Sequence, residues 1–502
     1  MKKQLFHYTL ATLLGLALAA LLLWLGATIP ARADPNIHCV NESGSGCGGD
    51  CGSCYSSVQA AVDAASPGHE IRIAGGTYAP GGTVAVITRE LRVIGGYAPD
   101  CNAHDPDLYQ TVLDAQWGGS VISITNAGHV ELYHLTLTNG DGTGNLTGMG
   151  AGGGIFNDNT NLLVAHSVIT DNLGSHSGRG WGGGIYSYSQ DGSHLTTLVE
   201  NQIVSNTAGT DPASNGDGGG VYVLGGEAYL QGNQILNNLG HGANKCWGGG
   251  VELVSLTWGE VLTNVIRGNV GSKTTNGYGS GLHVSGGKVR VAGNHIEDNW
   301  SSSGNGGGLE SAWSDLEITG NRIISNTSGA GGGMYIRSFT PVTMANNLIV
   351  RNDGGFRGGG MYLVHSIPDP TPAILVNNTV ADNSPDGIAT WGYVVLTMTN
   401  NLLAGNPVGI LASHPASLTL AADTNLFYDT SDPLTGSNGI QEDPLLTADY
   451  HLRAGSPAVD AGLTIPWLTV DLDGDSRPQG SAYDVGADEY VCRIYLPLVL
   501  RR

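Results

Sequence analysis

Two short motifs alternate along most of the chain and set its pattern of apolar and polar positions. One is a run of glycines followed by an apolar residue, and the other is Asn-x-Ile-x-x-Asn or a close variant. Inside each copy apolar and polar residues alternate, which is the periodicity of a β-strand. The apolar residues after the glycine runs lie 22 to 36 positions apart: Ile155, Ile185, Val221, Val251, Leu282, Leu309, Met334, Met361, Ile388 and Ile410.

A repeat of this length indicates a solenoid or a propeller. Gly, Asn, Ser and Thr crowd every copy and disfavour helix-pair repeats. A left-handed β-helix has a shorter and more uniform period, and a propeller blade needs about 40 to 45 residues. The sequence therefore predicts an all-β fold, a right-handed parallel β-helix solenoid with short strands and loops of variable length. We expect the recurring asparagines to stack from coil to coil, each side-chain amide bonding the next.

The two ends of the chain differ from the repeats. Residues 1–33 combine Lys2 and Lys3, a long apolar run and Ala31-Arg32-Ala33, which predicts a signal peptide, with an uncleaved membrane anchor as the alternative. Residues 55–65 predict an amphipathic helix with Ser57 as its N-cap, placed to cover the end of the solenoid. The predicted organisation is 1–33 signal peptide, 34–69 Cys-rich segment and capping helix, 70–430 β-helix, 431–490 closing module, and 491–502 tail, either a sorting or anchoring tag or a final strand.

The charge of the chain restricts its partners. The formal net charge is −22, and removal of Lys2, Lys3 and Arg32 with the signal peptide takes it to −25. Such a surface repels nucleic acid and anionic membranes, and it disfavours polyanionic glycans unless cations bridge them. We expect a secreted or surface-anchored monomer with no membrane span after signal cleavage.

Seven cysteines lie after the predicted signal peptide. Export favours disulfides. The cluster of Cys39, Cys47, Cys51 and Cys54 could instead hold zinc with four thiolates, or Cys51 and Cys54 could form a redox pair. The odd number leaves one thiol over or paired between chains. The isolated cysteines are Cys101, Cys246 and Cys492.

Alignment of the coils on their glycine runs produces one outward column of candidate site residues. Glu252 and Glu310, two coils apart, would have Cα atoms about 9.6 Å apart, close to the carboxylate separation of inverting glycosidases, about 6.5–9.5 Å. His283 between them could tune the pKa of one carboxylate. We therefore predict Glu252, Glu310 and His283 as catalytic candidates, with glycan binding without chemistry and a plain solvated face as the alternatives. The predicted sugar-binding residues are Tyr186, Tyr222, Tyr335 and Tyr362 in the column and Trp181, Trp247 and Tyr278 beside it.

One acidic segment near the C-terminus predicts a metal site. Asp471, Asp473 and Asp475 stand at alternate positions, as at the start of an EF-hand loop, and are candidate Ca²⁺ ligands. The twelfth position is Ala482, where an EF-hand has a bidentate glutamate, so calcium here would be weak or structural. A tight acidic turn without metal is the alternative.

Both ends of the mature chain resemble a known family. The segments at 70–78 and 91–97, after the predicted helix, resemble the start of exported bacterial proteins with the pectin-lyase-like right-handed β-helix. The segments at 456–462, 473–478 and 484–489 are similar to the choice-of-anchor Q module that closes such proteins. The repeats also resemble those of polymorphic outer-membrane adhesins, with Ile, Val or Leu in place of Phe. The resemblance implies export and a β-helix. We expect a protein that binds glycans or mediates adhesion, with a polysaccharide lyase or glycoside hydrolase as the alternative.

Overall fold

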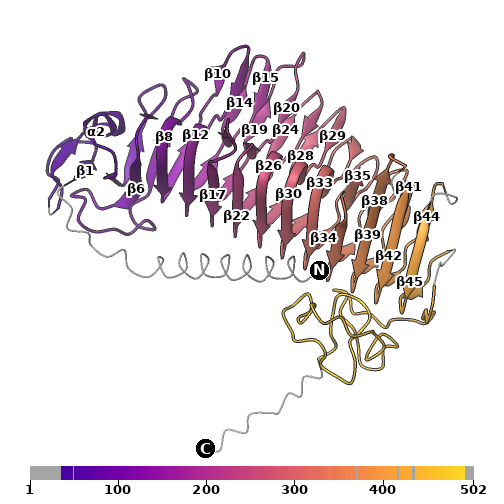
Figure 1. Ribbon diagram of the computed structural model, residues 1–502. Coiled ribbons are helices and arrows are strands. Elements are labelled where there is room, and N and C mark those ends of the chain that lie inside the picture. The colour runs from indigo at the N-terminus through magenta and orange to yellow at the C-terminus, as the bar shows by residue number, and fades with distance from the viewer. Residues whose placement is uncertain are drawn as a thin grey trace, which may run out of the picture.

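A computed structural model describes residues 36–491 apart from 49, 338–339, 369–370, 415–417 and 432–435. The predicted signal peptide, Cys492 and the rest of the tail lie outside these residues. The described chain winds into stacked coils that run along one axis, with the chain progressing from end to end (Figure 1). This arrangement confirms the predicted all-β right-handed parallel β-helix.

One coil from the middle of the solenoid shows the plan. Strand β26 (Val251–Leu262) bends at Ser255, where φ is 52°, and β27 (Val265–Arg267), β28 (Val270–Ser272) and β29 (Asn276–Tyr278) follow before the next coil opens with β30 (Leu282–Ala292). Strands of successive coils pair in parallel, as Val251 does with Leu282 and Val265 with His295. Each motif copy is therefore one coil.

The strands form four sheets, which we call A to D. Sheet A contains β26 and β30, and it runs along both sides of the bend. Its other strands are β1 (Ile37–Val40), β2 (Ser53–Tyr55), β3 (His69–Ala74), β5 (Ala85–Ile87), β6 (Leu91–Tyr97), β8 (Ile122–Tyr133), β12 (Ile155–Ala165), β16 (Ile185–Tyr188), β17 (Leu195–Val199), β21 (Val221–Leu224), β22 (Glu227–Gln231), β33 (Leu309–Thr319), β35 (Met334–Arg337), β36 (Val342–Ala345), β38 (Met361–His365), β39 (Thr371–Val376), β41 (Asp386–Gly392), β42 (Val394–Thr399), β44 (Val408–Ala412) and β45 (Thr419–Asp423). Sheet B contains β27 with β4 (Gly76–Tyr78), β7 (Thr111–Asp114), β9 (Leu135–Thr138), β13 (Val168–Thr170), β18 (Gln202–Val204), β23 (Gln234–Leu236), β31 (His295–Glu297), β34 (Arg322–Ile324), β37 (Leu348–Val350), β40 (Thr379–Ala381), β43 (Leu402–Ala404) and β46 (Leu426–Tyr428).

Sheets C and D belong to longer excursions of the middle coils, and we call the two together the extension. The extension lies along the upper rim of the solenoid in Figure 1. Sheet C contains β28 with β14 (Leu173–Ser175), β19 (Thr207–Gly209) and β24 (Leu239–His241). Sheet D contains β29 with β10 (Thr143–Leu146), β11 (Met149–Ala151), β15 (Arg179–Trp181), β20 (Gly216–Asp217), β25 (Cys246–Trp247) and β32 (Ser303–Asn305).

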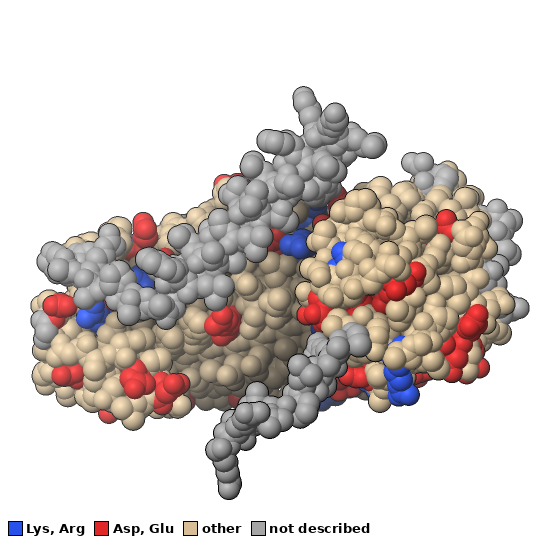
Figure 2. Space-filling model, turned by 90° about the horizontal axis from the view of Figure 1, so that it is seen from below, with Lys and Arg blue, Asp and Glu red and all other residues tan. Residues whose placement is uncertain are grey.

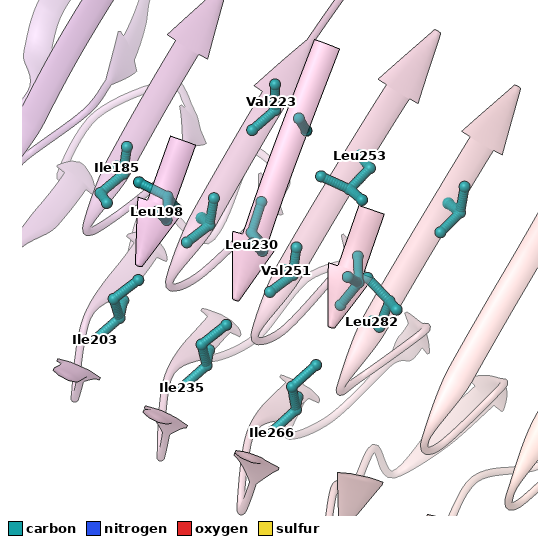
Figure 3. Packing of buried hydrophobic residues seen from close by; sticks show 14 of the residues in the cluster. Ile185, Leu198, Ile203, Val223, Leu230, Ile235, Val251, Leu253, Ile266 and Leu282 are labelled. Carbon is teal, nitrogen blue, oxygen red and sulfur yellow. The ribbon is translucent and has the colours of Figure 1, made fainter. Parts of the chain in front are cut away.

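The interior of the coils is a continuous apolar core. Each strand directs its alternate aliphatic side chains inward, where they stack on the equivalent residues of the neighbouring coils. Ile203, Ile235 and Ile266 of sheet B are paired in register and fully buried, as Figure 3 shows. A single coil could not bury these side chains, so the repeats stabilise one another.

Two ladders of buried asparagines line the corners on either side of sheet B, as the sequence predicts. In a typical step, the backbone N–H and the Nδ2 of Asn269 both donate to Oδ1 of Asn299, at 3.0 Å each, and Nδ2 also donates to the carbonyl of Ile235 at 2.9 Å. The first ladder is Asn201, Asn233, Asn264, Asn294, Asn321, Asn347, Asn378, Asn401 and Asn425. The second is Asn172, Asn206, Asn238, Asn269, Asn299, Asn326, Asn352, Asn383 and Asn406.

The third glycine of each run explains why the two motifs alternate. A methyl group added at Gly250 would lie 2.9 Å from Cγ of Asn269 and 2.6 Å from the carbonyl oxygen of Gly281. Only glycine leaves room there for the ladder asparagine. The same relation joins Gly184 to Asn206, Gly220 to Asn238, Gly281 to Asn299, Gly308 to Asn326, Gly333 to Asn352, Gly360 to Asn383 and Gly387 to Asn406.

Replacing Gly250 with alanine is therefore expected to lower the free energy of unfolding by about 1–3 kcal/mol, because the methyl overpacks a rigid site. The measurement is chemical denaturation followed by circular dichroism. Gly242→Ala is the control, since nothing lies within 4 Å of the added methyl there. Equal losses of stability in the two variants would contradict the prediction.

The N-terminal end is covered as expected. Helix α2 (Val58–Ala64) has Ser57 as its N-cap, whose Oγ accepts a hydrogen bond from the N–H of Ala60 at 3.3 Å. Its buried face consists of Val58, Ala61 and Val62. The helix is shorter than the predicted 55–65 because Tyr55 ends strand β2, which pairs with β1.

The cysteine cluster forms two disulfides, Cys39–Cys51 and Cys47–Cys54. This pairing confirms the prediction of disulfides, and both alternatives, a four-thiolate zinc site and a Cys51–Cys54 pair, are wrong. In the described part of the chain, Cys101 and Cys246 are free thiols, and both are buried.

The residues predicted as the closing module lie against the side of the last coils (Figure 1). They contain turns and isolated bridges in place of regular strands. Arg477 and Glu489 form a fully buried ion pair at 2.6 Å, and Arg477 also donates to Oδ1 of Asn346 in the coils at 3.0 Å. Nδ2 of Asn377 donates to the carbonyl of Asp484 at 2.8 Å. Polar corners of the coils therefore hold the module.

Candidate functional site

The predicted column exists as one line of paired residues on sheet A. Strand pairing places Glu252 beside His283 and His283 beside Glu310, so the three occupy consecutive coils. The alignment on the glycine runs is therefore confirmed. The aromatic and ionisable part of the line is Phe156, Tyr186, Tyr222, Glu252, His283, Glu310, Tyr335 and Tyr362.

The column is not open to solvent, although strand alternation places it on the outer face. Glu252, His283 and Glu310 are 6%, 3% and 0% exposed. Tyr186, Tyr222 and Tyr362 are also buried, whereas Tyr335 is half-buried. A second layer of chain must therefore cover the outer face of these strands.

The first glycine of each run brings that second layer into place. At Gly248 φ is +64°, and an added methyl would lie 2.7 Å from Cβ of Glu252. The chain turns at this glycine and packs against Glu252, which follows four positions later on sheet A. Only glycine adopts such a turn without strain. The pairs with the same close approach are Gly218 and Tyr222, Gly279 and His283, Gly306 and Glu310, Gly331 and Tyr335, and Gly358 and Tyr362.

The predicted sugar-binding rings stack largely on one another. Trp181 of sheet D lies 6.1 Å from Tyr186 and 5.6 Å from Tyr222, measured between ring centroids, and all these rings are nearly parallel. Trp247 and Tyr278 stack at 5.3 Å. Trp181, Trp247 and Tyr278 are half-buried, so their edges and remaining faces form part of the outer surface of the extension.

Asp217 is a member of this site that we did not predict. Strand pairing places it between Trp181 and Trp247, on the coil that separates them. Its carboxylate is fully buried and accepts hydrogen bonds from Nε of Arg179 at 2.7 Å and from Nε1 of Trp181 at 2.9 Å. Asp217 directly precedes Gly218, so the glycine alignment that identified Trp181 and Trp247 also contained it.

Arg179 joins the two tryptophans on the outer surface. Its guanidinium lies 5.4 Å from the ring centroid of Trp181 and 5.7 Å from that of Trp247. The Arg179 side chain is 41% exposed, although it pairs with the buried Asp217. The Arg179 guanidinium and the indoles of Trp181 and Trp247 therefore lie on one surface, and the buried Asp217 carboxylate beneath them bonds to Arg179 and Trp181.

The Glu252–His283–Glu310 group is an unusually polar part of the interior. Nδ1 of His283 lies 3.4 Å from Oε1 of Glu252, and Nε of Arg337 lies 3.4 Å from Oε1 of Glu310. Among the described residues, both Glu310 carboxylate oxygens and both His283 ring nitrogens find no hydrogen-bond partner. Buried polar groups without partners lower the stability of the folded chain.

Burial shifts the protonation of all three residues toward their neutral forms. It raises the pKa of Glu310 to about 7, against the opposing effects of His283 and Arg337. Burial and the nearby Asp217 raise the pKa of Glu252 well above its usual range. Burial lowers the pKa of His283. Protonated carboxyls near neutral pH are suited to general-acid chemistry, but in this conformation neither water nor a sugar has access to them.

The three predicted calcium ligands form a tight acidic turn. Oδ1 of Asp471 accepts the N–H groups of Asp473 at 2.9 Å and Asp475 at 2.8 Å, and Oδ2 accepts the N–H of Glu489 at 2.9 Å. The carboxylate of Asp473 pairs instead with Nε2 of His451 at 2.7 Å. This geometry favours the alternative interpretation, a turn held by hydrogen bonds, and calcium binding here remains an untested prediction.

Comparison with known proteins supports the fold. A family model described as a right handed beta helix region matches residues 263–424. No curated protein matches the chain. Together with the stacked parallel sheets, the match defines a right-handed β-helix repeat protein. Across the ranges that the structure describes, no helix has the length and apolar character needed to cross a bilayer.

Proposed function

We propose that this β-helix is exported and binds a neutral polysaccharide or cell-surface glycan without cleaving it. The observation that carries the proposal is the surface of sheet D, where four planar side chains are half-buried: Arg179 and Trp181 on one coil, and Trp247 and Tyr278 on the second and third coils after it. Aromatic rings that are packed on one side and exposed to solvent on the other are well suited to sugar recognition. They offer apolar contact area with little loss of side-chain entropy. We call these four residues the planar ridge.

Charge and covalent structure support the same proposal. The net charge of −22 disfavours polyanionic ligands, and acidic side chains outnumber basic ones over the face seen in Figure 2. The two disulfides are compatible with an oxidising extracellular environment. The burial of Glu252 and Glu310 favours binding over hydrolysis.

Replacing Trp247 with alanine is expected to weaken glycan binding at least tenfold, which corresponds to about 1.4 kcal/mol. The variant loses an indole that contacts Tyr278 and the Arg179 guanidinium. The measurement is affinity of the mature chain for a panel of neutral polysaccharides, by calorimetry or affinity electrophoresis. Trp467→Ala is the control, because Trp467 is 56% exposed and lies in the closing module. Equal affinity of wild type and Trp247→Ala for every ligand bound would contradict the proposal.

A glycan-cleaving enzyme is the second candidate, and one observation favours it. Glu310 and Glu252, with raised pKa values, flank His283 beneath the extension. If the extension opens, one carboxyl can act as acid and the other as base. The same polysaccharide panel tests this function through new reducing or unsaturated ends. Cleavage by the wild type that is lost in both Glu252→Gln and Glu310→Gln would favour the enzyme over the binding protein.

A further inference from the structure

Three sulfur atoms meet in the N-terminal cap. The Sγ atoms of Cys39, Cys51 and Cys101 all lie within 4.8 Å of one another. Cys39 belongs to β1 and Cys51 to the loop that follows it, whereas Cys101 lies in the turn after β6, 62 positions along the chain from Cys39. Cys39 and Cys51 are bonded, and Cys101 is a buried free thiol packed against them. A thiol is thus held beside a disulfide.

The Cys101 thiol contacts the backbone on both sides of Cys39. Its sulfur lies 3.7 Å from the carbonyl oxygen of Val40, the residue next to Cys39, and 4.0 Å from the carbonyl oxygen of Arg72, the strand partner of Cys39. Cys101 itself adopts a left-handed conformation, with φ of 59°, in a turn closed by a hydrogen bond from its N–H to the carbonyl of Ala98 at 2.7 Å. The turn therefore fixes the position of the Cys101 backbone beside β1.

We propose that the cap contains an intramolecular thiol–disulfide exchange site, in which Cys101 attacks the Cys39–Cys51 bond. The Cys101 thiolate forms a bond to Sγ of Cys39, the Cys39–Cys51 bond breaks, and Cys51 leaves as a thiolate. The proton lost by Cys101 is returned through solvent to Cys51. The number of disulfides stays the same, so the step needs no oxidant or reductant.

Burial decides which sulfur leaves. Cys39 is fully buried, whereas Cys51 is half-buried at the surface. A leaving thiolate is stabilised by water, so release of Cys51 is favoured over release of Cys39. The product carries a solvent-accessible thiol at Cys51 and a new link between β1 and the turn after β6. This link closes a longer loop than the original one, and in the chain-entropy account longer loops constrain the unfolded chain more.

The exchange is slow at neutral pH and accelerates in base. Burial raises the pKa of the Cys101 thiol to about 11. Below that pH the thiolate fraction rises about tenfold for each pH unit, and the exchange rate follows it, because the thiolate is the nucleophile.

Native peptide mapping tests the exchange. The mature protein is incubated at pH 7 and pH 9, quenched with acid, alkylated under native conditions, and cut without reduction by a protease specific for acidic residues. Glu42 and Asp50 separate Cys39, Cys47 and Cys51 into different peptides. We expect a Cys39–Cys101 peptide pair and alkylated Cys51 to accumulate much faster at pH 9 than at pH 7, with a rate that does not depend on protein concentration. The Cys47–Cys54 link serves as an internal control and should persist.

Two variants separate the exchange from general opening of the cap. Cys101→Ser should abolish alkylation of Cys51, whereas Cys246→Ser, at the other buried free thiol, should leave it unchanged. An intact Cys39–Cys51 link after long incubation of the wild type at pH 9, with Cys101 alkylated only after denaturation, would overturn the proposal. Exchange that depends on protein concentration would also overturn it, since the step would then be intermolecular.

Discussion

Replacing Asn299 with alanine is expected to lower the free energy of unfolding by about 4 kcal/mol. The Oδ1 of Asn299 accepts the N–H and Nδ2 of Asn269, and its own Nδ2 donates to the carbonyl of Ile266 at 2.9 Å and to Oδ1 of Asn326 at 2.9 Å. The variant leaves partners on both neighbouring coils unpaired in a fully buried position. Each such group costs roughly 1–3 kcal/mol, and the empty space adds to the loss.

Chemical denaturation followed by circular dichroism measures this effect. Hydrogen exchange shows where in the chain the destabilisation occurs. Because the coils of a solenoid contact only their neighbours, amide protection should fall first in the coils that contain Asn269 and Asn326. Asn102→Ala is the matched control, since Asn102 is exposed and its side chain bonds only to Asp100 among the described residues. A similar loss of stability in both variants would show that the ladder contributes little.

The variant Glu310→Gln is expected to gain stability relative to the wild type as the pH rises, by about 3 kcal/mol between pH 4 and pH 8. Burial raises the pKa of Glu310 from its ordinary 4.5 to about 7. Below pH 4.5 the carboxyl is protonated in both the folded and unfolded states, so its contribution to stability is fully present. As the pH rises from 4.5 to 7 the unfolded chain loses the proton first, and that contribution is lost. Glutamine has the same shape and does not ionise.

The groups facing Glu310 determine how the experiment is read. They are His283 on the preceding coil, Glu252 one coil further back, and Tyr335 and Arg337 on the following coil. The Arg337 side chain is 41% exposed and can turn to solvent in the variant. Burial lowers the pKa of His283, so its contribution is lost as the pH falls below 6.5, opposite in sign to that of Glu310. The informative quantity is therefore the difference between variant and wild type in denaturation experiments at pH 4, 6 and 8.

Glu317→Gln serves as the control for this pH series. Glu317 lies on the same strand, β33, but its side chain is 42% exposed and pairs with Arg290 at 3.4 Å. The comparison separates the buried carboxyl from a general change in surface charge. A stability difference between Glu310→Gln and wild type that is constant from pH 4 to 8 would mean that Glu310 ionises in the folded state as freely as in the unfolded chain.

The sequence by itself determined the solenoid, the register of its coils, the two asparagine ladders and the N-cap at Ser57. Each of these depends on residues that recur at one position per coil or lie within a single turn. Alternation assigns side chains to the inside or outside of a strand, and repetition aligns Glu252, His283 and Glu310 without any knowledge of the loops. Fold and column could therefore be predicted even though the excursions between the motifs vary in length.

Only the tertiary structure decided what covers that column and which cysteines pair. A strand pattern identifies an outer face but carries no information on which other segment packs over it. Glycines with positive φ turn the chain so that sheet D packs over the column, and Glu310 is completely buried. Strand pairing in sheet D places Asp217 between Trp181 and Trp247. Likewise, Cys101 lies beside Cys39 and Cys51 because of the path of its own turn, which is 62 residues from Cys39 along the chain. Contacts between segments without a shared repeat position are set by packing in three dimensions, so the spacing of residues along the chain could not reveal them.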